Sequence, residues 1–319
     1  MSTDWGRQVL LTAYRNGLSM GTPPGKNDHE RAKRGQVEGW SPSAVRRHTR
    51  WLYSINAPAL DGTGIAATLT LRDCPPDSDA WRAMLRAWIT RVERSGALRI
   101  HWVVEWTRRG VPHVHAAVYY PEGVEEADAG FRVIAAWLAV AGPHGALPFG
   151  QHWNPITGAL GWLGYLSKHA ARGVRHYQRS GKPEGWTTTG RLWGHRGEWP
   201  EEEPLRFSID RAGSYRMRRW VRGWRIADAR AAYSEIAARP VPRDPELARK
   251  HQLRVDAARR RIGSARRLLK RSERFSAVQG VSEWVPEHLA LSMLASLVDD
   301  GHAAVQEDSP AEPASATRK

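Results

Sequence analysis

The chain has 319 residues, of which 48 are lysine or arginine and 33 are aspartate or glutamate, giving a formal net charge of +15. This length favours two domains, or one domain with extensions, and the 41% of hydrophobic residues suffice for a buried core. The single cysteine, Cys74, excludes a disulfide framework and a cysteine-based zinc site. The longest apolar runs are about ten residues and the first residues are unlike a signal peptide, so we expect a cytoplasmic protein that does not span a membrane.

The positive charge is concentrated in one segment. Residues 211–274 hold 20 lysine and arginine residues against 6 acidic ones, so 14 of the 15 net charges lie there. Such an asymmetry indicates a polyanionic partner, and nucleic acid fits better than a membrane surface or a merely solvated basic helix. Charge alone implies no chemistry.

Hydrophobic periodicity and turn residues predict the elements in chain order. Residues 20–40, rich in glycine, proline and charge, are typical of a loop, and a helix follows with Ser41 as N-cap and Pro42 in its first position. A second helix is expected to begin with Ser78 as its cap. The predicted strands cover 65–73, 98–106 and 113–120, and the predicted helices cover 41–55, 78–94, 129–141 and 157–172.

These elements predict an α+β fold class, with a central antiparallel β-sheet flanked by helices, over residues 57–210. Residues 1–56 are expected to form an N-terminal loop and helix. Residues 211–305 are expected to form a basic α-helical DNA-binding region, because their apolar positions lie on one helical stripe among arginines. The tail 306–319 is expected to be disordered.

Two histidines, His113 and His115, lie one residue apart on the third predicted strand, and their side chains therefore point to the same face. If Gly110 closes a three-residue hairpin loop in the left-handed conformation, Glu105 stands opposite His113. Two imidazoles and one carboxylate then form a candidate site for a divalent metal, Mg²⁺ or Mn²⁺, and imidazole ligands favour Mn²⁺. The alternative is a polar strip on a half-exposed sheet.

A candidate nucleophile lies in the stretch GWLGYLSKHAAR. On a helix, Tyr165 and Lys168 are three residues apart and share a face, with His169 and Arg172 close by. The pKa of a tyrosine is near 10, so its phenol needs a neighbouring cation or a metal-polarised target to attack phosphorus at neutral pH. The alternative is an amphipathic helix with a tyrosine at its edge and a solvated lysine.

Three stretches, IAATLTLRD, VEWTRRGVPHVHAAV and GYLSKHAAR, in this order and at these separations, resemble the motifs of the HUH endonuclease superfamily. The chain is similar to the rolling-circle replication initiators of plasmids and filamentous phages, and GRLWGHRGEW at residues 190–199 resembles a segment that follows their tyrosine motif. The resemblance covers about residues 40–210 and implies an RRM-like or ferredoxin-like sheet.

The resemblance also implies roles for individual residues. His113 and His115 match the metal-ligand histidines, Glu105 the acidic third ligand, Tyr165 the nucleophile and Lys168 its accompanying lysine. His169 stands where two-tyrosine members carry a second tyrosine, so the chain resembles a single-tyrosine member. The implied function is replication initiation, in which single-stranded origin DNA is nicked, a 5′-phosphotyrosine forms and a 3′-OH is freed.

The basic C-terminal region supplies candidate DNA contacts. The stretch SYRMRRWVRGWR interleaves aromatic residues with arginines, as single-stranded DNA binding requires, or else forms a helix that buries its aromatics. The candidate DNA-binding residues are Arg172, Arg216, Arg218, Arg219, Trp220, Arg222, Trp224 and Arg225. The sixteen tryptophans exceed the usual need of a core, so exposed ones are candidates for stacking on unpaired bases.

Two further functions stay open from the sequence. One is an HUH transposase, and the other is a non-catalytic, basic nucleic-acid-binding regulator, which would bind without metal and cut no strand. The chain has no G-x-x-x-x-G-K-[ST] stretch, so an initiator of this kind would need a separate helicase. The sequence indicates neither the nick site nor the oligomeric state.

Overall fold

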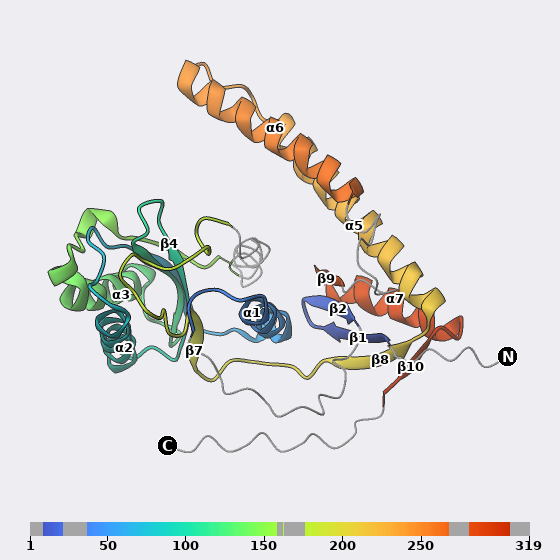
Figure 1. The fold of residues 1–319 in the computed structure, drawn as a ribbon, viewed down its shortest axis with the longest axis horizontal. Helices are drawn as coiled ribbons and strands as arrows, with labels where there is room; N and C mark the ends of the chain where they lie inside the picture. Colours follow the sequence, from blue (N-terminus) through green and yellow to red (C-terminus); the bar gives the residue numbers. More distant parts are fainter. Residues whose placement is uncertain (1–8, 22–36, 158–161, 163–175, 268–280, 307–319) are drawn as a thin grey trace. The chain divides into compact units, whose positions relative to one another are not determined.

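The computed structural model describes residues 9–21, 37–157, 162, 176–267 and 281–306. The chain divides into two compact units by its internal contacts. Residues 29–203 form one, and residues 1–28 together with 204–319 form the other. Each unit contains a five-stranded antiparallel sheet with helices, as Figure 1 shows, so the predicted α+β fold class is confirmed. We call residues 29–203 the central unit and the other the split unit.

The sheet of the central unit is built around the predicted hairpin. Its strand order is β6-β3-β5-β4-β7, and every neighbouring pair runs antiparallel. The strands are β3 (Thr63–Leu69), β4 (Arg99–Trp106), β5 (Pro112–Tyr120), β6 (His152–Pro155) and β7 (Trp193–Gly197). The first three were predicted, whereas the short edge strands β6 and β7 were not.

Three predicted helices of this unit are confirmed as α1 (Pro42–Ser54), α2 (Ser78–Arg94) and α3 (Glu126–Ala141), with 3₁₀ turns at Ala57–Ala59, Gly142–His144 and Pro148–Gly150. The helix predicted over 157–172 lies mostly outside the described residues, as does the tail 306–319. Ser41 caps α1 as predicted, since its side chain accepts from the backbone N–H of Ala44. The cap of α2 needs correction. Asp77, not Ser78, is the N-cap, because its carboxylate accepts from two backbone N–H groups of the first turn.

One face of this sheet is covered by α2 and α3, and the layer between them is rich in tryptophan. Trp81 and Trp88 of α2 and Trp137 of α3 are fully buried. A Cβ atom at Gly130 would lie 2.4 Å from the Trp153 ring, so α3 approaches β6 closely only because residue 130 is glycine. The opposite face carries Glu105, His113 and His115.

The tryptophans correct the expectation that exposed indoles await unpaired bases. In the described ranges nine tryptophans are buried and the other six are half-buried, so none belongs to the exposed class. Indole rings bury large apolar areas, and here they fill the core and line the helix–sheet contacts. The excess of tryptophan is therefore a packing feature of the described residues.

The sheet of the split unit joins both ends of the chain, with strand order β10-β8-β1-β2-β9. Its strands are β1 (Val9–Tyr14), β2 (Gly17–Gly21), β8 (Leu205–Ile209), β9 (Val281–Trp284) and β10 (Ala303–Val305). Its helices are α5 (Arg211–Ala237), α6 (Pro245–Arg267) and α7 (Glu287–Asp299). The core lies between the sheet and helices α5 and α7, with Leu11, Met217 and Leu297 at its centre.

This second sheet corrects two expectations. Residues 1–56 were predicted to hold only a loop and a helix, but β1 and β2 form a hairpin there. Residues beyond 211 were predicted to be helical, but β9 and β10 are strands. The missed strands are only three to six residues long and find their partners far along the chain, so local periodicity is too short to reveal them. Across the described ranges, no helix combines the length and apolarity needed to cross a membrane.

Candidate metal centre

The hairpin formed by β4 and β5 has the predicted register. Glu105 pairs with His113, and Val103 pairs with His115. The turn is closed by Gly110, whose φ of 76° lies in the left-handed region that favours glycine, and the carbonyl of Thr107 accepts from its backbone N–H. Alternation along the two strands therefore places Glu105, His113 and His115 on one face of a rigid sheet.

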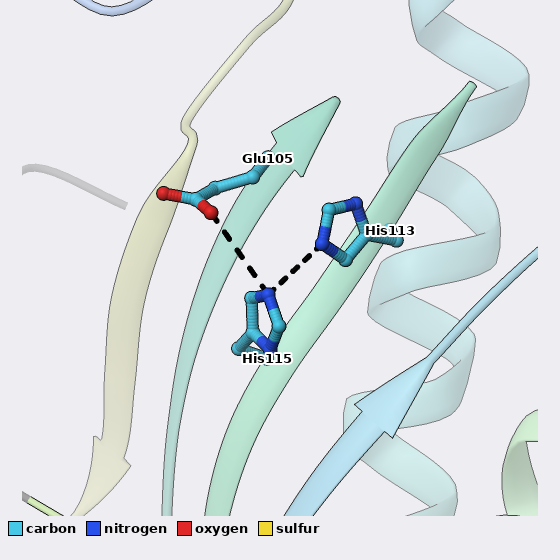
Figure 2. Close-up of side chains that lie close together, drawn as sticks. All are labelled: Glu105, His113 and His115. Atoms are coloured by element: carbon cyan, nitrogen blue, oxygen red, sulfur yellow. Dashed lines mark hydrogen bonds and ion pairs between the residues drawn. The ribbon is translucent and has the colours of Figure 1, made fainter. Parts of the chain in front are cut away.

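The three side chains converge on one point, as Figure 2 shows. The Nε2 atoms of His113 and His115 are 2.9 Å apart, and the Nε2 of His115 is 3.9 Å from Oε2 of Glu105. One ligand atom from each residue lies within 4.8 Å of the other two. All three side chains are buried, and Glu105 has no exposed surface.

The donor set fits a divalent ion. Two ligand atoms at right angles, each about 2.1 Å from an ion, lie about 3 Å from one another, which matches the distance between the two imidazole nitrogens. Without an ion, the same distance lets one imidazole donate a hydrogen bond to the other. Two nitrogens and one carboxylate oxygen suit Mn²⁺ or another transition ion better than Mg²⁺.

Thr68 of β3 orients one of the ligands. Its Oγ1 is 3.3 Å from Nδ1 of His115, and the two residues are cross-strand neighbours. When Nδ1 carries the proton and donates it to Thr68, the lone pair of Nε2 points toward His113 and Glu105. A second contact of this kind fixes the ring orientation and raises the basicity of the ligand nitrogen.

The carboxylate of Glu105 is held from behind by Arg179, which the sequence did not single out. Nε of Arg179 donates to Oε1 of Glu105 at 3.1 Å, and both side chains are fully buried. Because Oε1 accepts from the guanidinium, Oε2 is the oxygen that faces His115. Arg179 therefore presents Glu105 through one oxygen.

Arg179 is in turn held by Trp40. The guanidinium carbon lies 4.3 Å from the centroid of the Trp40 ring, a cation–π arrangement. The indole N–H of Trp40 donates to the carbonyl of Val104, next to Glu105 in β4. The chain after residue 176 also runs along this strand, since the backbone N–H of Trp106 donates to the carbonyl of Gln178. Three separate segments thus meet behind the carboxylate.

A second pair of histidines lies on the same sheet face. His48 of α1 and His101 of β4 are fully buried, with their Nε2 atoms 3.1 Å apart, and the His101 ring packs against Trp51. Burial, aided by the nearby His195, lowers the pKa of His101 to about 3. His101 is therefore neutral at physiological pH, and its surroundings are those of a packed core.

The remaining predicted catalytic residues are not in the described part of the chain. Tyr165 and Lys168 lie in the range 163–175, outside the described residues, as do His169 and Arg172. Their roles stay predictions. Of the proposed metal ligands, all three are described, and the structure brings them together.

The predicted DNA-contacting residues on α5 have partners within the split unit. Trp220 and Trp224 pack against the core, and the indole N–H of Trp224 donates to the carbonyl of Trp284. Arg216 pairs with Asp300, and Arg225 pairs with Glu283. The Nε of Arg222 donates to the carbonyl of Arg266, whereas Arg218 is half-buried and Arg219 is exposed.

The comparisons with known proteins agree on one class. Residues 64–170, which include β3, the β4–β5 hairpin and the three converging ligands, match the family of replication-associated proteins described by ORF2 and the phage gene 2 protein. A protein of Xylella fastidiosa (strain 9a5c) named "Putative replication protein" is 42% identical over 308 residues, covering 93% of this chain and 99% of that protein. No solved structure gave a match.

Two further relatives extend this result. A second "Putative replication protein", from Xylella fastidiosa (strain Temecula1), is 47% identical over 232 residues, covering 70% of this chain and 87% of that protein. The replication-associated gene 2 protein of Pseudomonas phage Pf3 is 39% identical over 298 residues, covering 92% of this chain and 98% of that protein. The chain belongs to this family of replication-associated proteins.

Proposed function

We propose that this protein initiates rolling-circle replication by nicking single-stranded DNA at an origin, as a single-tyrosine HUH endonuclease. The observation that carries the proposal is the convergence of Glu105, His113 and His115 on the hairpin predicted from their motif. Membership of a replication-associated family supplies the biological setting. The motif stretch that follows the hairpin supplies the candidate nucleophile, Tyr165.

The proposed chemistry is a transesterification. A divalent ion, Mn²⁺ or Mg²⁺, held by Glu105, His113 and His115 supplies Lewis acidity toward a phosphodiester oxygen. The phenolic oxygen of Tyr165 forms a bond to phosphorus while the bond to the DNA 3′-oxygen breaks. The phenolic proton is lost to solvent, and the departing 3′-oxygen is protonated to a 3′-OH. Lys168, three residues from Tyr165, stabilises the phenolate.

Exchange of one phosphodiester for another conserves the bond, so religation needs no ATP. The free 3′-OH is a primer for synthesis, which a replication initiator requires. Strand separation is assigned to a separate helicase, because the chain has no phosphate-binding loop of the Walker type. The relatives carry replication names, which favours an initiator over a transposase.

The direct test is capture of the covalent product. The full chain is incubated with single-stranded origin DNA and Mn²⁺, and adducts are resolved on a denaturing gel and mapped by mass spectrometry. We expect an adduct at Tyr165 that is abolished in Tyr165→Phe. The matched control is Tyr177→Phe, which removes an exposed phenol and should leave the adduct intact. An adduct that persists in Tyr165→Phe would refute the assignment.

The rival function, a regulator that only binds nucleic acid, makes the opposite prediction. Binding would be independent of metal, and no adduct would form with any divalent ion. Adduct formation that requires Mn²⁺ and is lost in His115→Ala would exclude it.

A further inference from the structure

The helices α5 and α6 of the split unit form a protruding arm. The first half of α5 buries Met217 and Val221 against the sheet, but beyond them only Ala229 of the described α5 side chains is buried. In α6 the buried side chains of the described residues are Ala258 and Ala265. The two helices pack on one another through these small residues, and Figure 1 shows them extending away from β1, β2 and β8 of the same unit. We call residues 222–267 the arm.

The arm is strongly basic and supports little else. It holds 13 lysine and arginine residues against 5 acidic ones, a net charge of +8. Its helix α6 has 23 residues and is therefore about 34 Å long, close to one turn of B-form DNA. The core of the arm is too small to explain this charge by packing.

The cations of the arm include two contrasting groups. Four have acidic partners: Arg225 with Glu283, Arg239 with Glu235, Lys250 with Glu246, and Arg261 with Asp228. Five exposed arginines have no acidic partner within the described ranges. They are Arg230, Arg243, Arg249, Arg254 and Arg260.

Three of these arginines project from the outer side of α6. Arg249 is nine residues, or two and a half turns, from the buried Ala258, so it points to the opposite side. Arg260 lies eleven residues from Arg249, close to three turns, and projects in nearly the same direction about 16 Å further along. Arg254 projects from a flank between these two levels.

The chemistry of this surface selects a duplex partner. Binding of single strands depends on aromatic side chains that stack on bases. The two aromatic residues of the arm are engaged: Trp224 bonds to Trp284, and Arg259 covers the ring of Tyr233. Cations without aromatics recognise phosphates, and a straight helix about as long as one duplex turn follows a phosphate backbone.

We infer that Arg249, Arg254 and Arg260 on the outer side of α6 form a docking surface for the phosphate backbone of double-stranded DNA. This inference deepens the proposed function, because it gives the initiator a duplex-binding surface distinct from the metal centre. It also corrects the sequence-based choice of DNA contacts on α5, since Arg216 and Arg225 are committed to internal ion pairs.

The test compares two variants of equal charge. The surface variant, Arg249→Ala with Arg254→Ala and Arg260→Ala, removes three arginines that lack acidic partners. The paired variant, Arg239→Ala with Lys250→Ala and Arg261→Ala, removes three cations of the same arm whose charges are already neutralised locally. Affinity for a fluorescent duplex is measured by anisotropy from about 50 to 200 mM salt. Circular dichroism confirms that both variants retain their helices.

We expect the slope of log K against log salt to fall in magnitude by about 2 to 3 for the surface variant, and by less than about 1 for the paired variant. Equal changes in the two variants would overturn the inference, because the effect would then follow net charge alone. An unchanged slope in the surface variant would overturn it too. So would an equal loss of binding to single-stranded DNA or to anionic phospholipid vesicles.

The nicking reaction is scored separately. The surface variant should still form the covalent adduct with a short single-stranded oligonucleotide, and Tyr165→Phe should bind the duplex with the wild-type salt slope. Absence of any adduct together with the expected slopes would refute the nickase and leave the docking surface standing.

Discussion

Arg179 and Glu105 form an ion pair that is fully enclosed by protein, with the guanidinium stacked on Trp40 and one carboxylate oxygen left to face His115. The pair joins residues 74 positions apart in sequence. Removing one partner of a buried pair leaves an uncompensated charge, which is far more costly than the loss of an exposed pair.

We therefore expect Arg179→Met to lower the free energy of unfolding by about 3 to 5 kcal/mol and to weaken Mn²⁺ binding, because Glu105 loses its support. Arg179→Lys keeps the charge and should recover part of the metal affinity. Denaturant unfolding and Mn²⁺ titration followed by electron paramagnetic resonance measure the two effects. As a control, Arg132→Met breaks an exposed pair with Asp128 and should cost about 1 kcal/mol or less. Wild-type Mn²⁺ affinity in Arg179→Met would show that the ion pair is only structural.

The hydroxyl of Thr68 provides a milder test of the metal centre. Thr68→Val removes the partner of His115 Nδ1 while keeping the shape of the side chain. We expect Mn²⁺ affinity to fall about 10-fold or more, with little change in thermal stability in the absence of metal. Thr63→Val, in the same strand, removes a hydroxyl that bonds to the carbonyl of Val124 instead and should leave Mn²⁺ affinity unchanged. Calorimetric titration of both variants with Mn²⁺ distinguishes the two positions.

The buried His101 predicts a pH dependence of stability. Burial holds its pKa at about 3 in the folded state, against about 6.5 when unfolded, so below pH 6.5 protons bind preferentially to the unfolded chain. Stability is thus complete above about pH 6.5 and falls, by up to about 1.4 kcal/mol per pH unit, as pH drops toward 3. His101→Phe should flatten this slope in melts between about pH 7 and 5, whereas substitution of the half-buried His288 should not. An unaltered slope in His101→Phe would assign the acid sensitivity to other groups.

The two units predict where the chain can be cut. Residues 29–203 are continuous and contain their own sheet and core, so we expect this fragment to unfold cooperatively and to bind Mn²⁺. A fragment ending at residue 210 retains β1, β2 and β8 but loses β9, β10, α5 and α7. It should therefore expose the apolar face around Leu11 and bind a hydrophobic dye. Equal dye binding by the two fragments would contradict the division.

The sequence predicted the metal centre because its determinants are local. Alternation along a strand and one glycine in the turn set the positions of Glu105, His113 and His115, and none of these depends on distant residues. The fold class and the main helices followed from periodicity for the same reason. The position of Tyr165 relative to these ligands stays a prediction.

Arg179 was not predictable, because no local pattern says which of many arginines is buried against a given carboxylate. The second sheet failed for a related reason: its short strands gain stability only from partners about 200 or more residues away in the case of β1 and β2, and about 100 away in the case of β10. The only local signal was the Asn16–Gly17 dipeptide at the turn between β1 and β2, a sequence typical of tight hairpins.

The pairing of β1 with β8 has a consequence for biosynthesis. The first strands to leave the ribosome lack their hydrogen-bonding neighbours until residues 205–209 have been made, and β9 and β10 come later still. At about 5 to 20 residues per second, this delay is about 10 to 40 seconds. The intervening segment 29–203 can complete its own sheet during that interval, so the N-terminal hairpin waits, with its apolar side uncovered, for the end of the polypeptide.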